Sequence, residues 1–172
     1  MRFIFLVTLF MSSLFADLSN INSFEADFTQ TIEDENGKQL SYTGHIIATK
    51  PQYALWQYKN PIEKEIYISL YSLTVIEPEI EQVIVRNISS EFNFFQMIKN
   101  AKKIAKNRYE TKIEHTLYTI VSTKENKIKN IYYLDEIGNK ISIDFTQEKI
   151  NKKVDKKVFV PKIPNGYDII EG

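Results

Sequence analysis

Apolar and polar residues alternate along most of the first half of the chain. Phe24, Ala26 and Phe28 are each followed by a polar or acidic residue, and the same alternation returns between Leu40 and Ala48. A period of two is typical of antiparallel strands with one buried face. The polar stretch Asp34–Lys38 contains Asn-Gly, which accepts the positive φ angles of a tight turn. The pattern therefore predicts a β-hairpin.

Prolines mark the ends of the strands that follow. Pro51 closes the second strand, which runs from Leu40 to about Lys50, and Pro61 separates the next two strands. Pro78 ends a further strand that includes Leu73 to Ile76. Proline cannot donate a hydrogen bond to a sheet, so each of these positions favours a strand boundary.

The period changes after residue 89. Phe94, Ile98, Ala101 and Ala105 are spaced by four, three and four residues, and Phe95, Met97 and Ile104 broaden this apolar stripe. The residues Lys99, Lys102, Lys103 and Lys106 lie off the stripe. This spacing predicts an amphipathic helix from Ser90 to Lys106, with a capping signal at Ser89-Ser90-Glu91.

Strand patterns resume and continue to the end of the chain. We expect a short helix over Asp17–Ser23, strands over Tyr109–His115, Leu117–Ser122, Ile128–Leu134 and Lys140–Phe145, a charged connector over Lys149–Lys157 and a last short strand around Phe159. Many short strands in sequential order with few helices predict a mainly β (α+β) fold. Its strongly curved antiparallel sheet must have one face covered.

The first sixteen residues have the pattern of a secretory signal peptide. Arg2 is positively charged, residues 3–11 are almost wholly apolar, and Ala16 offers a small residue at a cleavage point. This apolar run is too short to span a membrane comfortably. We therefore expect residues 1–16 to be removed and residues 17–172 to form a single domain.

Composition narrows the classes of function. The chain has no cysteine, so no disulfide stabilises it and residue 17 cannot carry a lipid anchor. Lys plus Arg and Asp plus Glu both number 22, and a neutral chain lacks the basic field that sequence-independent nucleic-acid binding requires.

No pattern of catalytic or metal-binding residues is present. Nucleophile motifs, zinc motifs and phosphate-binding glycine loops are all missing from the sequence, and His45 and His115 are its only histidines. Glu77, Glu79 and Glu81 flank a proline and are expected on a solvated edge. The sequence predicts no catalytic residue, no cofactor and no metal, and favours a protein that is not an enzyme.

The order of several motifs resembles the LolA family of periplasmic lipoprotein carriers. They are Phe24-x-Ala26-x-Phe28-x-Gln30, Lys50-Pro51, Trp56, Pro61, Pro78-x-x-x-Gln82-Val83, and the ending from Phe159-Val160-Pro161 to Gly166-Tyr167-Asp168. Two departures stand out. Ala54 replaces a usual phenylalanine, and Ser69-Leu70-Tyr71-Ser72 replaces a usual Asp-Gly turn, which leaves either a wider turn or a bent strand.

The resemblance implies an incomplete β-barrel whose helices form a lid over an apolar concave face. Aromatic residues make up 13% of the chain, and on composition alone they could equally fill a core. With the resemblance, we expect a cavity for acyl chains. Its candidate lining residues are Phe28, Ile46, Tyr53, Leu55, Trp56, Ile66, Ile68, Leu73, Val75, Val83, Phe94, Phe95 and Ile98. Lys50 stands where the family usually has an arginine that latches the lid, and is the latch candidate.

The resemblance also implies partners and a location. A monomeric carrier in the periplasm would take triacylated lipoproteins from an ATP-driven inner-membrane transporter, and whether a dedicated outer-membrane acceptor exists is left open. A lipid- or lipoprotein-sensing regulator of the same fold is the alternative. A third role, docking to membranes through Lys99–Lys106, is weighed against a simple solvated helix face, and the neutral chain favours the latter.

Overall fold

The computed structural model describes residues 18–88, 94–125 and 127–172. The expected signal peptide and the expected helix cap at 89–91 lie outside these ranges. In the described part of the chain, twelve strands form one sheet in the order β12-β6-β5-β4-β3-β2-β1-β11-β10-β9-β8-β7. β7 and β12 are the two edges, so the sheet does not close on itself.

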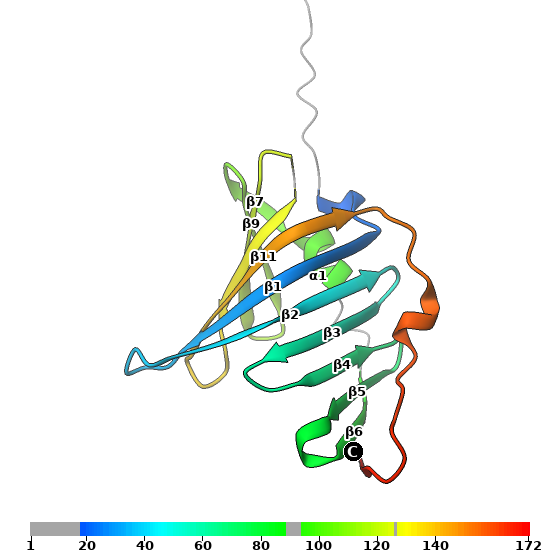
Figure 1. Cartoon of the computed structure of the whole chain (residues 1–172). Coiled ribbons are helices and arrows are strands. Elements are labelled where there is room, and N and C mark those ends of the chain that lie inside the picture. Colours follow the sequence, from blue (N-terminus) through cyan, green and yellow to red (C-terminus); the bar gives the residue numbers. More distant parts are fainter. Residues whose placement is uncertain (1–17, 89–93, 126) are drawn as a thin grey trace, which may run out of the picture.

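The strands follow the chain as a meander with two long-range pairings, β1 with β11 and β12 with β6. They are β1 (Ser23–Glu33), β2 (Gln39–Thr49), β3 (Tyr53–Asn60), β4 (Lys64–Ile68), β5 (Ser72–Glu77), β6 (Gln82–Asn87), β7 (Lys102–Ala105), β8 (Arg108–Ile113), β9 (Thr116–Ser122), β10 (Ile128–Leu134), β11 (Lys140–Ile150) and β12 (Asp168–Glu171). β1 lies between β2 and β11, and all neighbours are antiparallel except β12 and β6. Figure 1 shows the sheet curving around its interior, which confirms the expected mainly β fold.

Neighbouring strands of the sheet approach each other closely at Gly44 on β2. A Cβ placed there would lie 2.2 Å from the carbonyl oxygen of Gln57 and 2.6 Å from Cζ of Phe28. Only glycine fits such a contact without shifting the backbone of the next strand. The Phe28 ring therefore lies directly against the β2 backbone.

The helix is shorter than the sequence pattern predicted. α1 spans Phe94–Asn100, and the expected second half of the helix is instead the edge strand β7. β7 pairs with β8 through a turn in which Asn107 has φ 58°, a left-handed conformation that asparagine tolerates. The expectation of a helix to Lys106 is wrong because pairing with β8 takes over after Asn100.

The two ends of the described chain also differ from expectation. A three-residue 3-10 helix, η1 (Leu18–Asn20), precedes β1. Phe159 lies in another, η3 (Lys156–Phe159), and not in a strand, because the Asp155 side chain accepts a hydrogen bond from Lys157 N and caps a helical turn. The last strand is β12, which pairs in parallel with β6.

The Ser69–Ser72 segment forms a short turn between β4 and β5. Ser69 N donates to the carbonyl oxygen of Ser72 over 2.9 Å, and Ser72 N donates to Ser69 Oγ over 3.1 Å. Side-chain hydrogen bonds thus replace the positive-φ residue of an Asp-Gly turn. Of the two alternatives, a turn is present and a continuous bent strand is not.

Candidate functional site: an apolar cavity beneath a short lid

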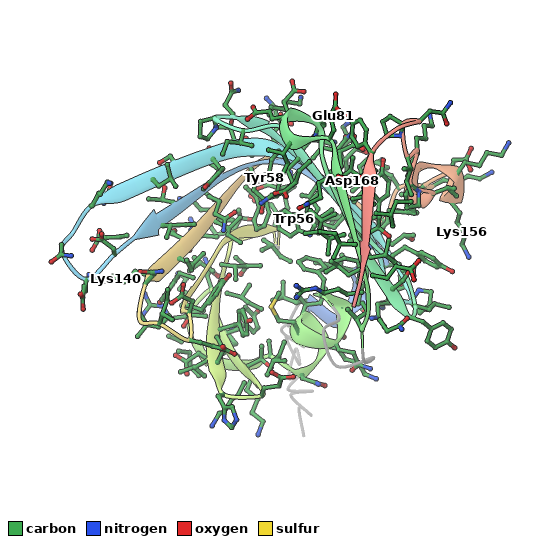
Figure 2. The ribbon with its side chains drawn as sticks, turned by 90° about the horizontal axis from the view of Figure 1, so that it is seen from below. Trp56, Tyr58, Glu81, Lys140, Lys156 and Asp168 are labelled. Carbon is green, nitrogen blue, oxygen red and sulfur yellow. The ribbon has the colours of Figure 1, made fainter. Side chains whose placement is uncertain are left out.

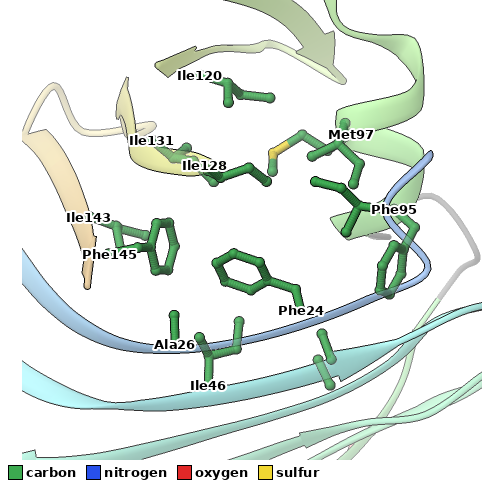
Figure 3. Packing of buried hydrophobic residues seen from close by; sticks show 14 of the residues in the cluster. Phe24, Ala26, Ile46, Phe95, Met97, Ile120, Ile128, Ile131, Ile143 and Phe145 are labelled. Carbon is green, nitrogen blue, oxygen red and sulfur yellow. The ribbon is translucent and has the colours of Figure 1, made fainter. Parts of the chain in front are cut away.

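The concave face of the sheet and the lid share one hydrophobic core. By the lid we mean η1 and α1. Phe24 of β1 contacts Phe94 of α1 with ring centroids 5.5 Å apart, and Phe95, Met97 and Ile98 are buried in the same cluster. Figure 3 shows Phe95 and Met97 facing the side chains of β1, β2 and β11. The expected covering of the concave face by α1 is confirmed.

The lid and the sheet leave a cavity of about 320 Å³ between them. On one side it is bounded by β3, β4 and β5, and on the other side by β8 to β11, with α1 above it. The lining residues are Gln30, Gln52, Tyr53, Ala54, Trp56, Tyr58, Ile66, Ile68, Leu73, Phe94, Phe95, Met97, Ile113, Tyr118, Ile131, Tyr133 and Ile143. The wall is almost entirely aromatic and aliphatic, as is usual for sites that hold apolar ligands.

Aromatic rings make up the deep part of this wall. Trp56 packs edge-on against Phe28 at 5.1 Å between ring centroids, and Tyr118 lies 4.7 Å from Tyr133. Figure 2 shows Trp56 and Tyr58 directed into the interior of the curved sheet, whereas Lys156 lies on its outside. Packed rings of this kind give a broad apolar surface with few directional contacts.

The phenol groups on the wall are uncharged at neutral pH. Burial raises the pKa of Tyr58 to about 12, and it likewise raises the pKa of Tyr133 to about 12. The Tyr58 hydroxyl donates a 2.8 Å hydrogen bond to Oε1 of Gln30, a second wall residue. The cavity therefore offers neutral hydroxyls and, among the described residues that line it, no charged side chain.

The candidate residues separate into three groups. The residues that line the cavity are Trp56, Ile66, Ile68, Leu73, Phe94 and Phe95. Tyr53 borders the cavity, but its ring packs against Phe159 on the convex face of the sheet. Phe28, Ile46 and Ile98 belong to the core behind it, and Val75 pairs with Ile66 on the concave face without lining it. Leu55 and Val83 lie on the convex face in a second cluster with Phe159, so their assignment to the cavity wall is corrected. The strand alternation turns Leu55 away because its neighbour Trp56 faces inward.

The second half of the chain supplies wall residues that sequence reasoning missed. Ile113, Tyr118, Ile131, Tyr133 and Ile143 come from β8 to β11. Their strands alternate apolar and polar residues, and this period was the signal that could have identified them. The other lining residues that the sequence analysis did not predict are Gln30, Gln52, Ala54, Tyr58 and Met97.

Lys50 contacts the N-terminal part of the lid. Its Nζ donates to the carbonyl oxygen of Ser19 over 3.1 Å and to Oδ1 of Asn22 over 3.0 Å. Asn151, which follows β11, adds a 3.1 Å hydrogen bond from Nδ2 to the carbonyl oxygen of Asn20. These bonds satisfy carbonyl groups of η1 and attach it to the ends of β2 and β11.

Several titratable groups outside the cavity form pairs at the surface. His45 Nδ1 lies 2.7 Å from Oδ1 of Asp27, and Lys149 Nζ lies 2.8 Å from Oε1 of Glu25. No group of three potential metal ligands occurs among residues 18–88, 94–125 and 127–172. Within the same ranges no helix has the length and apolar character needed to cross a membrane.

Comparison with known proteins places these features in a family. The family described as outer membrane lipoprotein carrier protein LolA matches residues 19–116. The chain is 38% identical to the outer-membrane lipoprotein carrier protein of Campylobacter jejuni subsp. jejuni over 94% of both chains. It is 34% identical to the protein of the same name from Helicobacter hepaticus over 99% of this chain and 95% of that one.

A solved structure shares the fold at low sequence identity. The crystal structure of an uncharacterized conserved protein from Thermus thermophilus covers 90% of this chain and 93% of its own, with a TM-score of 0.55 and 7% identity. That likeness concerns the fold alone, whereas the family match and the two carriers extend to the sequence. With its open curved sheet and lidded cavity, the chain belongs to the outer-membrane lipoprotein carrier family.

Proposed function

We propose that this protein is a periplasmic carrier that binds the acyl chains of lipoproteins and delivers them toward the outer membrane. The observation that carries the proposal is the apolar cavity enclosed between the concave sheet and the lid. The role consists of binding and transport, without catalysis. It agrees with the names of the related carriers from Campylobacter and Helicobacter.

Shielding is the physical task of such a carrier. Each acyl methylene exposed to water costs about 0.8 kcal/mol, so three acyl chains together cost tens of kcal/mol. Contacts with rings and branched side chains compensate for this cost without fixing one bound geometry. A wall with neutral phenols and no charge suits cargo that must be accepted and later released.

The size of the cavity implies that the lid moves when cargo enters. Pockets for ligands of ordinary size range from roughly 300 to 1,000 Å³, and the 320 Å³ found here lies at the lower end. Three acyl chains need more room than this. We infer that α1 and η1 are displaced during loading.

The energy for loading comes from a partner. Extraction of a lipoprotein from a bilayer is uphill, and the sequence contains no nucleotide-binding motif. An ATP-driven transporter in the inner membrane would supply this work, and the carrier would pass the cargo to the outer membrane directly or through an acceptor.

The test uses Trp56, which is the only tryptophan in the chain and lines the cavity. Titration with a triacylated lipopeptide should shift its fluorescence to shorter wavelength, because acyl chains exclude water from the indole. The same peptide without acyl chains should have no effect. Native mass spectrometry of the protein isolated with released lipoproteins should give a one-to-one complex.

A matched pair of variants makes this test specific. Leu73→Asn places an amide on the cavity wall and should weaken lipopeptide binding by about tenfold, given the usual value of a buried leucine. Leu134→Asn changes the same residue type at an exposed position and should leave affinity unchanged. Equal affinities of both variants and the parent would show that acyl chains bind elsewhere.

A further inference from the structure

The edge of the sheet next to the lid is strongly basic. β7 has no strand on its outer side, because the order of the sheet ends there. Lys102 and Lys103 of this strand, Lys106 of the following turn and Arg108 of β8 are all exposed. Three of the lysines that were expected on a solvated helix face, Lys102, Lys103 and Lys106, therefore lie on one hairpin, whereas Lys99 remains on α1.

A second turn adds charge at the same end of the molecule. Arg108 pairs with Val121, and Ser122 N donates a 2.9 Å hydrogen bond to the carbonyl oxygen of Asn107. This contact joins the β7–β8 turn to the segment that connects β9 with β10 and carries Lys124 and Lys127. Figure 1 shows both connections at the end of the sheet where η1 lies.

Together these elements form what we call the basic patch. It consists of Lys99, Lys102, Lys103, Lys106, Arg108, Lys124 and Lys127. Residues 99–110 and 123–127 contain these seven basic residues and two acidic ones, a formal excess of five positive charges in a chain whose net charge is zero. Lys102, Lys106 and Lys124 form no ion pair within 4.0 Å with any residue that the structure describes.

The opposite end of the sheet is rich in acidic residues. The acidic residues in the turns and strand ends there are Glu33, Asp34, Glu35, Glu63, Glu77, Glu79, Glu81, Glu114, Asp135 and Glu136. They outnumber the lysines of the same segments, which are Lys38, Lys59, Lys64, Lys112 and Lys140, the last of which pairs with Glu33. Although the net charge of the chain is zero, positive charge is concentrated at one end of the strands and negative charge at the other. A molecule with this charge distribution is oriented by an anionic surface, with the basic end directed toward it.

An exposed apolar side chain lies within the basic patch. Ile104 of β7 is 49% exposed; Lys102 and Lys103 precede it, and Lys106 follows two residues later. Long basic side chains around an isolated aliphatic residue are typical of surfaces that contact a bilayer. There the lysines reach the phosphates while the apolar group enters the interface.

We propose that the basic patch docks the carrier onto anionic phospholipid. The patch is joined to the lid, since Lys99 lies in the last turn of α1 and the nearby Met97 lines the cavity. Docking would therefore place the lid at the bilayer surface, where acyl chains enter or leave. The proposal concerns the empty protein and does not depend on the carrier function being correct.

The composition of the patch favours lipid over an acidic protein as the partner. Six of its seven basic residues are lysines, and the one aromatic residue within residues 99–110 and 123–127, Tyr109, is buried. Lysine is a hydrated point charge, whereas protein interfaces concentrate tyrosine, tryptophan and arginine. The positive charges are spread over the end of α1 and two turns, and such an arrangement suits a lipid surface whose negative charges are also spread out.

The experiment measures co-sedimentation of the empty protein with protein-free vesicles. Vesicles of phosphatidylethanolamine and phosphatidylglycerol should bind it at low ionic strength and release it at high ionic strength, while neutral phosphatidylcholine vesicles should not bind it. The triple variant Lys102→Gln/Lys106→Gln/Lys124→Gln should bind roughly a hundredfold more weakly, at about fivefold per charge. Adding Ile104→Asn to the triple variant should weaken vesicle binding by a further factor of about three.

A charge-matched control separates docking from a change in net charge. Lys38→Gln/Lys59→Gln/Lys162→Gln removes the same number of charges from exposed lysines outside the patch and should reduce binding by less than about twofold. Thermal unfolding of both triple variants should match that of the parent. Equal loss of binding in the two triple variants would overturn the proposal.

Two further results would also overturn it. One is a parent protein that stays in solution with anionic vesicles at low salt. The other is binding that appears only when vesicles carry a membrane protein, which would assign the patch to an acidic protein surface. Neither result would affect the Trp56 titration, so docking and the carrier function are tested separately.

Discussion

Tyr58 carries a buried hydroxyl whose protonation is linked to stability. Burial raises its pKa to about 12 in the folded protein, whereas in the unfolded chain the group titrates near its ordinary value of about 10. The unfolded state therefore loses the proton first as the pH rises. The stability that the protonated Tyr58 hydroxyl contributes to the folded state is therefore fully present below pH of about 10 and is lost by about pH 12.

We expect alkaline pH to lower the free energy of unfolding through this residue. Because the pKa of Tyr58 differs by about two units between the folded and unfolded states, the free energy of unfolding should fall by roughly 2–3 kcal/mol between pH of about 9 and 12. Urea unfolding of the parent and of Tyr58→Phe across this range measures the effect, because the phenylalanine variant should show a shallower decline. Tyr71→Phe, at an exposed position, should decline like the parent. Identical curves for Tyr58→Phe and the parent would contradict the assignment.

Single residues also show the limits of sequence reasoning about the site. Alternation correctly predicts that β3 is a strand, yet it also requires that Leu55 and Trp56 point to opposite faces. On the family resemblance, both residues were expected to line the cavity, but only Trp56 does so. Strand positions could be predicted from the sequence, but which face holds a cavity and which holds a covering segment depends on distant parts of the chain.

At the scale of elements, we expect the attachment of η1 to determine how readily the lid opens. Lys50 and Asn151 hold the carbonyl groups of Ser19 and Asn20 from two different strand ends. Both side chains act at the surface, so their hydrogen bonds contribute little to global stability. They are well placed to control opening, since they bridge the lid and the sheet.

We expect Lys50→Leu to speed release of cargo more than it lowers stability. Loss of its hydrogen bonds to η1 should raise the rate of lipopeptide transfer to acceptor vesicles by about fivefold, while the free energy of unfolding changes by less than about 1 kcal/mol. Lys59→Leu, which changes an exposed lysine away from the lid, serves as the control. Transfer by Lys50→Leu at the rate of the parent would show that Lys50 is no latch.

The elements that were misassigned share a physical cause. Residues 101–106 have helical spacing of apolar residues, but an antiparallel neighbour arriving later in the chain converts them into β7. β12 pairs with β6, which lies far earlier in the chain, and local sequence gives no sign of this partner. The central strands were predictable because their alternation and turns agree locally with the final fold.

The whole molecule is held together by two cores on opposite faces of one sheet. The second core lies on the convex face, where Phe159 packs against Tyr53 with ring centroids 5.7 Å apart and is 5% exposed. The segment after β11 thus returns across the outside of the sheet before it adds β12. This segment fastens the C-terminal end to strands whose other face lines the cavity.

We expect Phe159→Ala to lower the free energy of unfolding by about 3–5 kcal/mol, the usual cost of removing a buried phenylalanine. Val160→Ala, one residue further and 61% exposed, should change it by less than about 0.5 kcal/mol. Urea unfolding of the two variants provides the measurement. A small effect of Phe159→Ala would mean that the second core does not support the sheet.

The position of β1 between β2 and β11 governs the order in which the protein can fold. Phe24 pairs with Ile150, so the strand that begins the sheet is completed only when the last long strand is available. Contacts across such long sequence separations form slowly, because the loop between them must close first. We therefore expect the complete sheet to form only after β11 has been synthesised. For a chain that is exported in extended form, as the signal peptide expected at residues 1–16 would require, this delay favours export, and chaperones would protect the exposed strands during that interval.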